Sequence, residues 1–214
     1  LHFLSSNSRF NVSKIQVLNT EMLKKAILIL AAGAASRFGS PKQLARIRSK
    51  TLIQRAYDCA TQLFPDDTFV VLGAHRNTIL EELTAVNSIP QSRILYNRNW
   101  AFGIGESINF GVQVLENQYD EIMIILADQV QITPRDIQRL LDSCVGDAII
   151  CADYNGSRGV PAIFPKKHFE HLTGLSGDTG AKALLQREDI KIIAIPMPNA
   201  AIDVDYPDDL INIE

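Results

Sequence analysis

An arginine and a lysine follow an aliphatic run and a series of small residues, a combination suited to binding a polyphosphate. Residues 27–30 are aliphatic, residues 31–35 are alanine or glycine, and Arg37 and Lys42 come next. Small side chains let a ligand lie directly against the backbone, whose exposed N–H groups bind phosphate oxygens together with nearby cations. The alternative for the same residues is a tight strand-to-helix turn with two solvated cations.

This loop differs from both common phosphate-binding motifs. A Walker A loop has Lys and Ser or Thr directly after its second glycine, whereas Gly39 is followed by Ser40 and Pro41. The G-x-G-x-x-G pattern of dinucleotide-binding folds is also missing from this stretch. A polyphosphate site here must therefore be of another kind.

Two aspartates are suited to holding a divalent metal beside such phosphates. Asp128 comes just after the aliphatic run 122–126, at the carboxyl end of an expected strand, where open α/β sheets bind ligands. Asp205 closes the alternating run 202–205. Magnesium takes a few carboxylates together with water and phosphate oxygens, so both aspartates are candidate Mg²⁺ ligands. An aspartate that starts a loop or caps a helix is the alternative at each position.

The elements that must position these residues alternate between apolar runs and helical patterns. Strands are expected over residues 27–30, 69–72, 94–96, 122–126, 147–151, 160–164 and 190–195. Helical spacing of apolar residues or a helix-start signal marks residues 52–63, 79–86, 108–115, 133–136 and 181–185. This alternation predicts βαβ units in one Rossmann-like, three-layer α/β/α domain with a mostly parallel sheet. A turn over residues 155–159 indicates a hairpin or an antiparallel strand inserted after residue 151.

Composition limits the classes of partner. The chain has 214 residues and a formal net charge of −3, so charge favours neither nucleic acid nor an anionic membrane as a partner. No apolar run approaches the length that spans a membrane. Cys59, Cys144 and Cys151 show no C-x-x-C pairing, which indicates reduced, mostly buried thiols in a cytoplasmic protein.

The loop resembles the signature L-A-x-G-x-[ST]-x-R-[MF]-G-x-x-K-x-L of nucleotidyltransferases with a doubly wound α/β fold. The residues that fit it are Leu30, Ala31, Ala32, Gly33, Arg37, Phe38, Gly39, Lys42 and Leu44, while Ser36 stands one position after the Ser or Thr of the signature. Residues 127–129 resemble an A-D-Q-P element of the same enzymes, and residues 203–210 resemble their D-[IV]-D-T-P-E-D-L ending. Val130 replaces the usual proline and Tyr206 the usual threonine.

Three further stretches resemble the same enzymes. Residues 99–107 contain the [WY]-x-x-G-x-x-x-S part of the pattern N-x-x-[WY]-x-x-G-x-x-x-S, residues 158–161 resemble R-G-x-P, and residues 177–181 resemble G-D-x-G-A. The whole set is most similar to the molybdenum cofactor cytidylyltransferases, a group of MobA-like nucleotidyltransferases with the fold of nucleotide-diphospho-sugar transferases. In that group a nucleoside triphosphate reacts with a pterin phosphate and releases pyrophosphate.

The resemblance implies a role for each matching position. Catalysis is implied for Arg37, Lys42 and Asp128, and Mg²⁺ binding for Asp128 and Asp205. Nucleotide binding is implied for Leu30, Ala31, Ala32, Gly33, Arg37, Lys42, Gly103, Ser107 and Asp128. Acceptor binding is implied for Arg158, Gly159, Pro161, Asp178 and Thr179. Two alternatives stand beside these roles: residues 103–107 as an ordinary helix-entry turn, and Asp178 as a plain N-cap.

Ala32 bears on the choice of nucleotide. Similar enzymes that use a guanine nucleotide carry L-A-G-G, and the extra methyl group of Ala32 would crowd a purine and suit a pyrimidine. The expected reaction is therefore transfer of CMP from CTP to a molybdopterin-type acceptor, with a molybdoenzyme or its chaperone as an expected partner. Two alternatives remain. One is transfer to a sugar or polyol phosphate, and the other is a non-catalytic nucleotide- or cofactor-binding protein, which Val130 and Tyr206 keep open.

The expected domain organisation is simple. Residues 1–22 are expected to be an N-terminal extension, disordered or packed against a neighbour, because the first methionine is Met22 and residues 22–25 would open a strand-first domain. The first twenty residues also lack the apolar core of a secretory signal. Residues 23–214 are expected to form the nucleotidyltransferase domain.

Overall fold

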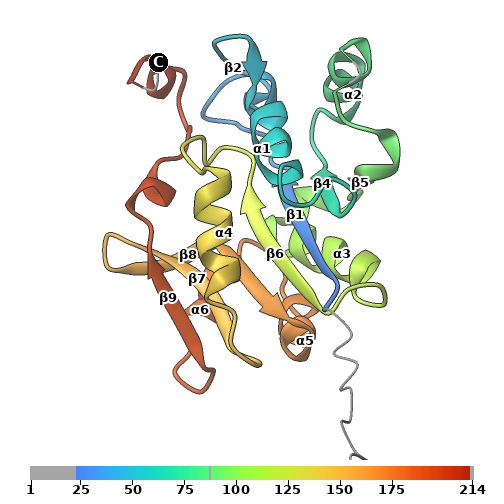
Figure 1. Cartoon of the computed structure of the whole chain (residues 1–214). Coiled ribbons are helices and arrows are strands. Elements are labelled where there is room, and N and C mark those ends of the chain that lie inside the picture. The colour runs from blue at the N-terminus through green and yellow to red at the C-terminus, as the bar shows by residue number, and fades with distance from the viewer. Residues whose placement is uncertain (1–22, 87, 213–214) are drawn as a thin grey trace, which may run out of the picture.

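The computed structural model describes residues 23–86 and 88–212, which contain a seven-stranded sheet with helices on both faces (Figure 1). The strand order is β5-β4-β1-β6-β8-β7-β9. The strands are β1 (Lys25–Ala31), β4 (Thr68–Leu72), β5 (Ile94–Tyr96), β6 (Glu121–Leu126), β7 (Ile149–Tyr154), β8 (Ser157–Pro165) and β9 (Ile192–Pro196). All neighbouring pairs are parallel except those of β8, which runs antiparallel to both β6 and β7. The expected α/β/α fold is confirmed, and the expected extension over residues 1–22 lies outside the described residues.

Two apolar layers sandwich the sheet. Alternate side chains of β1 enter opposite layers, so that Ile27 and Ile29 face one layer and Leu28 and Leu30 the other. The first layer contains α1 (Leu52–Thr61), α2 (Arg76–Ala85) and α4 (Pro134–Asp142), and the second contains α3 (Ile104–Leu115), α5 (Phe169–Thr173) and α6 (Ala181–Leu185). Because β1 is buried on both faces, it reads as a continuous aliphatic run rather than an alternating pattern.

A tight hairpin joins β7 to β8. Asn155 and Gly156 both have positive φ angles, 53° and 70°, as the two central residues of a type I′ turn require. The hairpin returns β8 between β6 and β7, so that it separates the parallel strands. The inserted antiparallel strand expected from the sequence is confirmed.

Some expected boundaries are wrong by a few residues. The strand expected over residues 147–151 begins at Ile149, because the preceding residues form a turn in which Ala148 N donates to Val145 O. The last strand begins at Ile192, and α2 ends before Val86, which is half exposed. A short hairpin of β2 (Arg46–Ile47) and β3 (Lys50–Thr51) precedes α1. Within residues 23–86 and 88–212, no helix is both long and apolar enough to cross a membrane.

The helix start expected at residues 133–136 is confirmed as a capping box. Thr133 Oγ1 accepts from Asp136 N, and the Asp136 carboxylate accepts from Thr133 N at 3.0 Å. Asn199 Nδ2 also donates to this carboxylate at 2.8 Å. Burial by itself would raise the pKa of Asp136, but the hydrogen bonds from Thr133 and Asn199 outweigh it and lower the pKa.

We expect Asp136→Asn to lower the free energy of unfolding by about 1 kcal/mol at neutral pH, as the loss of a cap does. Because the pKa of Asp136 is lower in the folded than in the unfolded state, its contribution is complete above the unfolded pKa. The contribution is lost as pH falls through the folded pKa. Urea unfolding at pH 7 and at about pH 3 should therefore show the difference from wild type shrinking in acid. Asp142→Asn on the same helix is the control, and an equal loss there would contradict the cap.

Candidate active site

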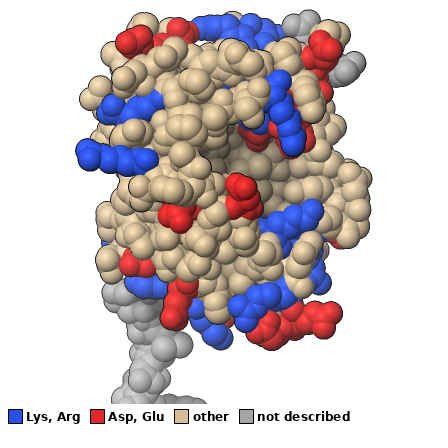
Figure 2. Space-filling view, turned by 180° about the vertical axis from the view of Figure 1, so that it is seen from behind, with Lys and Arg blue, Asp and Glu red and all other residues tan. Residues whose placement is uncertain are grey.

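A cavity of about 760 Å³ opens where β1 and β6 end (Figure 2). Basic and acidic side chains meet at the edge of this hollow. The expected site residues that line it are Leu30, Ala31, Ala32, Gly33, Arg37, Lys42, Gly103, Ser107, Asp128, Asp178 and Asp205. The structure therefore brings residues 31–35, here called the small-residue loop, and both candidate metal ligands into one cavity.

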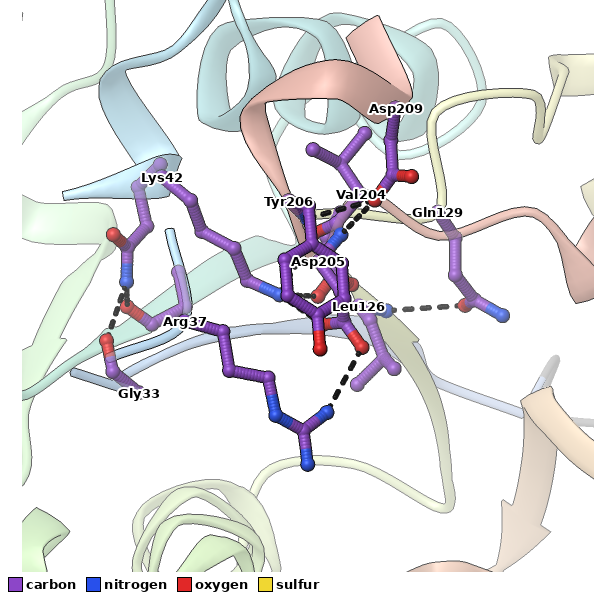
Figure 3. A network of polar contacts seen from close by, with 12 residues as sticks. Gly33, Arg37, Lys42, Leu126, Gln129, Val204, Asp205, Tyr206 and Asp209 are labelled. Carbon is purple, nitrogen blue, oxygen red and sulfur yellow. Dashed lines mark hydrogen bonds and ion pairs between the residues drawn. The ribbon is translucent and has the colours of Figure 1, made fainter. Parts of the chain in front are cut away.

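Lys42 lies between the two aspartates. Its Nζ is 2.6 Å from Asp128 Oδ2 and 3.1 Å from Asp205 Oδ1, and it donates to Val204 O at 2.9 Å. Arg37 approaches Asp205 from the rim, with Nη1 3.4 Å from Oδ2 (Figure 3). Burial by itself would lower the pKa of Lys42, but the two carboxylates outweigh it and raise the pKa, so the side chain is cationic at neutral pH.

The two carboxylates fit a divalent cation. Asp128 Oδ1 is buried and has no hydrogen-bond partner in the described part of the chain, so this oxygen is left to accept a ligand. No cluster of three or more His, Cys, Asp or Glu side chains suited to a metal occurs among the described residues. A metal here would therefore be held by Asp128 and Asp205 with water and phosphate oxygens, which is the donor set that magnesium prefers.

Two side chains that sequence reasoning missed hold the small-residue loop. Gln43 is buried, and its Nε2 donates to Ala31 O at 2.9 Å and to Gly33 O at 2.8 Å. A ring nitrogen of His75 lies 3.2 Å from Ala34 O. Gln43 occupies a position that the signature leaves open, beside Lys42, so only its proximity to the motif could have identified it.

Two further side chains hold the segments that carry the aspartates. Gln129 is buried, and its Nε2 donates to Val160 O at 2.7 Å and to Ala200 O at 2.9 Å, which links β8 to the C-terminal segment. The carboxylate of Asp209 accepts from Asp205 N at 2.8 Å and from Tyr206 N at 2.7 Å (Figure 3). Asp209 thus caps the turn that begins at Asp205 and Tyr206, and Asp205 itself lines the cavity.

The glycines at the start of α3 make room for the protein's own backbone. Gly103 has φ 114°, and a Cβ there would lie 2.2 Å from Gly177 O. Gly105 N donates to the same carbonyl at 2.9 Å. The interpretation of this stretch as a helix-entry turn is confirmed, because Gly103 is the N-cap of α3. Ser107 lies in the first turn of that helix, is buried, and accepts from Asn97 Nδ2 at 3.1 Å, so its hydroxyl proton remains available for a ligand.

Of the five expected acceptor residues, the structure places one at the cavity and four elsewhere. Asp178 lines the cavity, and its alternative role as an N-cap is wrong, since Gly180 is the N-cap of α6 and no side chain caps that helix. Arg158, Gly159, Pro161 and Thr179 are absent from the described lining of the cavity. Arg158 Nη1 instead donates to Leu185 O at 3.4 Å, and Gly159 packs against the Tyr154 hydroxyl. Acceptor binding by these residues stays a prediction.

The family model of the MobA-like NTP transferase domain matches residues 27–192. This chain belongs to that family. The MobA-like chain is 26% identical over 168 residues to the purine catabolism protein PucB of Bacillus subtilis, covering 74% of this chain and 79% of PucB. The matched range includes the small-residue loop, Lys42 and Asp128, but ends before Asp205.

Solved structures share the fold of this MobA-like chain. Rv0371c of Mycobacterium tuberculosis superposes with a TM-score of 0.73 at 23% identity, over 89% of this chain and 97% of that one. A second structure of Rv0371c, in complex with manganese, gives a TM-score of 0.71 at 22% identity over the same shares. The molybdopterin-guanine dinucleotide biosynthesis protein A of Archaeoglobus fulgidus gives 0.62 at 14% identity, over 89% and 96%. These likenesses confirm the fold and nothing beyond it.

We expect Gln43→Met to raise the KM for nucleotide by about tenfold, because two loop carbonyls would lose their donor at a cost of about 1–3 kcal/mol. The loop would then relax away from the geometry that Gln43 imposes, while the charged groups at Lys42 and Asp128 remain. Steady-state kinetics with varied nucleotide would measure the change. Gln62→Met, on the exposed end of α1, is the matched control, and an unchanged KM in Gln43→Met would contradict the positioning role.

Proposed function

We propose that this chain is a Mg²⁺-dependent nucleotidyltransferase that transfers CMP from CTP to the phosphate of a molybdopterin-type acceptor and releases pyrophosphate. The observation that carries the proposal is the meeting of Lys42 and Arg37 with Asp128 and Asp205 beside the small-residue loop. Membership of the MobA-like family and the motifs shared with cytidylyltransferases support it further.

The chemistry is a displacement at phosphorus. An oxygen of the acceptor phosphate attacks the α-phosphorus of the nucleotide, and the bond from that phosphorus to the bridging oxygen breaks, so that pyrophosphate leaves with the electron pair. Lys42 and Arg37 would stabilise the charge that gathers on the phosphates. The backbone of residues 31–33 would hold the nucleotide, and positioning replaces any covalent nucleophile.

Asp128 and Asp205 would hold the metal. Mg²⁺, when bound, would neutralise and orient the polyphosphate. Support comes from the unpartnered buried oxygen of Asp128 and from the manganese complex of the Mycobacterium tuberculosis protein. Mn²⁺ should therefore substitute for Mg²⁺ in the assays below.

The preference for a pyrimidine rests on Ala32. This residue lines the cavity and is buried, and its carbonyl accepts from Ala74 N at 2.9 Å. A Cβ at Gly73 would lie 2.7 Å from the same carbonyl, so the backbone of residue 73 packs closely against Ala32. The methyl group would then be a fixed obstacle to a larger base.

A catalytic role is favoured over mere binding. Val130, which replaces the usual proline, packs in a small apolar cluster with Leu52 and Val204, and Val204 N donates to Asp128 O at 3.2 Å. Tyr206, which replaces the usual threonine, has a half-exposed ring, and its N–H is held by Asp209. Both departures therefore leave Asp128 and Asp205 facing the cavity.

Pyrophosphate release tests the proposal directly. The protein is incubated with Mg²⁺, molybdopterin and CTP, GTP, ATP or UTP in turn, and a second panel replaces molybdopterin by sugar and polyol phosphates. Release with CTP and molybdopterin is expected. Release with GTP instead would contradict the argument from Ala32, and release only with the second panel would move the proposal to those acceptors. If no combination of nucleotide and acceptor releases pyrophosphate although CTP binds, the chain would be a non-catalytic nucleotide-binding protein.

The proposed setting is the cytoplasm. All three cysteines are free thiols, as a reducing compartment predicts, and burial raises the pKa of Cys59 and of Cys151 to about 11. The nucleotide form of the cofactor would then pass to a molybdoenzyme or to its chaperone, which is the proposed protein partner.

A further inference from the structure

Lys42 uses the same oxygens that a metal would need. Its ammonium group contacts Asp128 Oδ2 at 2.6 Å and Asp205 Oδ1 at 3.1 Å, and Val204 O supplies a third acceptor. The side chain is 18% exposed, so water competes little for these contacts. The three donor positions of the ammonium group are thus matched by three acceptors, one from the loop after β6 and two from the C-terminal segment.

A divalent cation and this ammonium group exclude each other. Both are positive and both require the carboxylates of Asp128 and Asp205, and their mutual repulsion is strong where solvent is scarce. Lys42 contacts Asp128 Oδ2 and Asp205 Oδ1, and Arg37 contacts Asp205 Oδ2 at 3.4 Å. This leaves Asp128 Oδ1 without a partner in the described chain, and one oxygen is a poor metal site by itself. Metal binding must therefore be accompanied by departure of Lys42.

A polyphosphate bound at the small-residue loop would give Lys42 an alternative set of acceptors. Lys42 begins a short 3₁₀ turn, Lys42–Leu44, a few residues after that loop, and it lines the cavity together with Ala34 and Arg37. A lysine has a flexible stem and a compact charge, so it can exchange carboxylates for phosphate oxygens without movement of the backbone. A polyphosphate in the cavity would supply those oxygens.

We propose that Lys42 is an internal counter-ion that couples metal binding to nucleotide binding. Without nucleotide it neutralises Asp128 and Asp205 and keeps their affinity for a divalent cation low. A bound triphosphate draws Lys42 away, and the two carboxylates then accept the metal. This coupling rests on the proposed function for its nucleotide, whereas the competition between Lys42 and the metal does not.

Arg37 is the comparison that separates two effects on metal affinity. One is occupation of the two carboxylates by a cation, and the other is the general repulsion of a metal by positive charge. Arg37 carries the same charge as Lys42 and lies in the same cavity, but its side chain is 68% exposed, and among the described residues its ion pair is with Asp205, at 3.4 Å. If overall positive charge set the metal affinity, Arg37→Met and Lys42→Met would act alike. If occupation of the carboxylates sets it, Lys42→Met would act far more strongly.

The experiment measures Mn²⁺ binding to the full chain by electron paramagnetic resonance. Without nucleotide, Lys42→Met is expected to bind Mn²⁺ about tenfold or more tightly than wild type, and Arg37→Met within about threefold of it. Adding a non-hydrolysable CTP analogue is expected to tighten Mn²⁺ binding about tenfold in wild type and much less in Lys42→Met. Lys42→Gln, which can still donate to Val204 O, should behave as Lys42→Met does. If Lys42→Met does not fold, Lys42→Gln is measured in its place.

Three outcomes overturn the proposal. Equal or weaker Mn²⁺ binding in both Lys42 variants than in wild type would remove the competition. Equal gains in Lys42→Met and Arg37→Met would reduce it to a general charge effect. Unchanged Mn²⁺ affinity in wild type when the analogue binds would remove the coupling. If the analogue does not bind at all, the proposed function fails, while the comparison without nucleotide still decides the role of Lys42.

Discussion

Asp128→Asn is expected to reduce pyrophosphate release by about 10³-fold or more, since phosphoryl transfer depends on charge neutralisation at the phosphates. The substitution keeps the shape of the side chain but removes the charge that lies 2.6 Å from Lys42 Nζ. Nucleotide binding in the absence of metal should be retained or strengthened, because Lys42 would lose a competing partner. Steady-state pyrophosphate release and equilibrium binding of the nucleotide would measure the two effects separately.

Asp208→Asn is the matched control for this prediction. Asp208 is exposed, lies in the same C-terminal segment as Asp205, and is absent from the lining of the cavity. The rate of pyrophosphate release by Asp208→Asn should stay within about twofold of the wild-type rate. If Asp128→Asn kept a tenth or more of the wild-type rate, the proposed role of this carboxylate in charge neutralisation would be contradicted.

Lys25→Met is expected to lower the free energy of unfolding by about 3 kcal/mol, because it would leave a buried carboxylate without its cation. Lys25 and Glu121 form an ion pair between β1 and β6, at the end of the sheet away from the cavity, and the Glu121 side chain is 4% exposed. Urea unfolding followed by circular dichroism would measure the loss. The nucleotide KM of the folded variant should be unchanged.

Two companion variants separate the ion pair from other effects. Lys24→Met changes an exposed neighbour of Lys25 and should alter stability by less than about 0.5 kcal/mol. The double variant Lys25→Met with Glu121→Leu removes both charges and should recover most of the stability, since an apolar pair of similar volume is often as stable as a buried ion pair. Full stability in Lys25→Met alone would contradict the expectation.

Local patterns in the sequence determined most of the fold. The aliphatic runs of β1 and β6 are buried on both faces, so their continuous hydrophobicity identifies them without knowledge of their neighbours. The start of α4 was recognisable because Thr133 and Asp136 satisfy backbone groups within a few residues. Asn155 and Gly156 indicated the hairpin for the same reason, since the turn depends on two adjacent residues.

The same local logic identified most residues of the cavity. Lys42 follows the small-residue loop and Asp128 follows a buried strand, and the ends of parallel strands converge at one edge of the sheet. The acceptor side was less predictable. Asp178 reaches the cavity because the loop that carries it packs against Gly103, while Arg158 turns to Leu185. Neither direction can be derived from spacing along the chain.

Tertiary structure alone decided how the charges are arranged. Lys42 and Asp205 are far apart in the chain, and their 3.1 Å contact depends on the C-terminal segment returning to the end of β6. Gln43 and Gln129 acquire their roles in the same way, because each donates to carbonyls of segments that only the folded chain brings together. The sequence by itself determined which residues could carry the chemistry, since residue type and local spacing are local properties. Only the fold decided which of them meet, because a contact across the chain depends on the path of every element between its two ends.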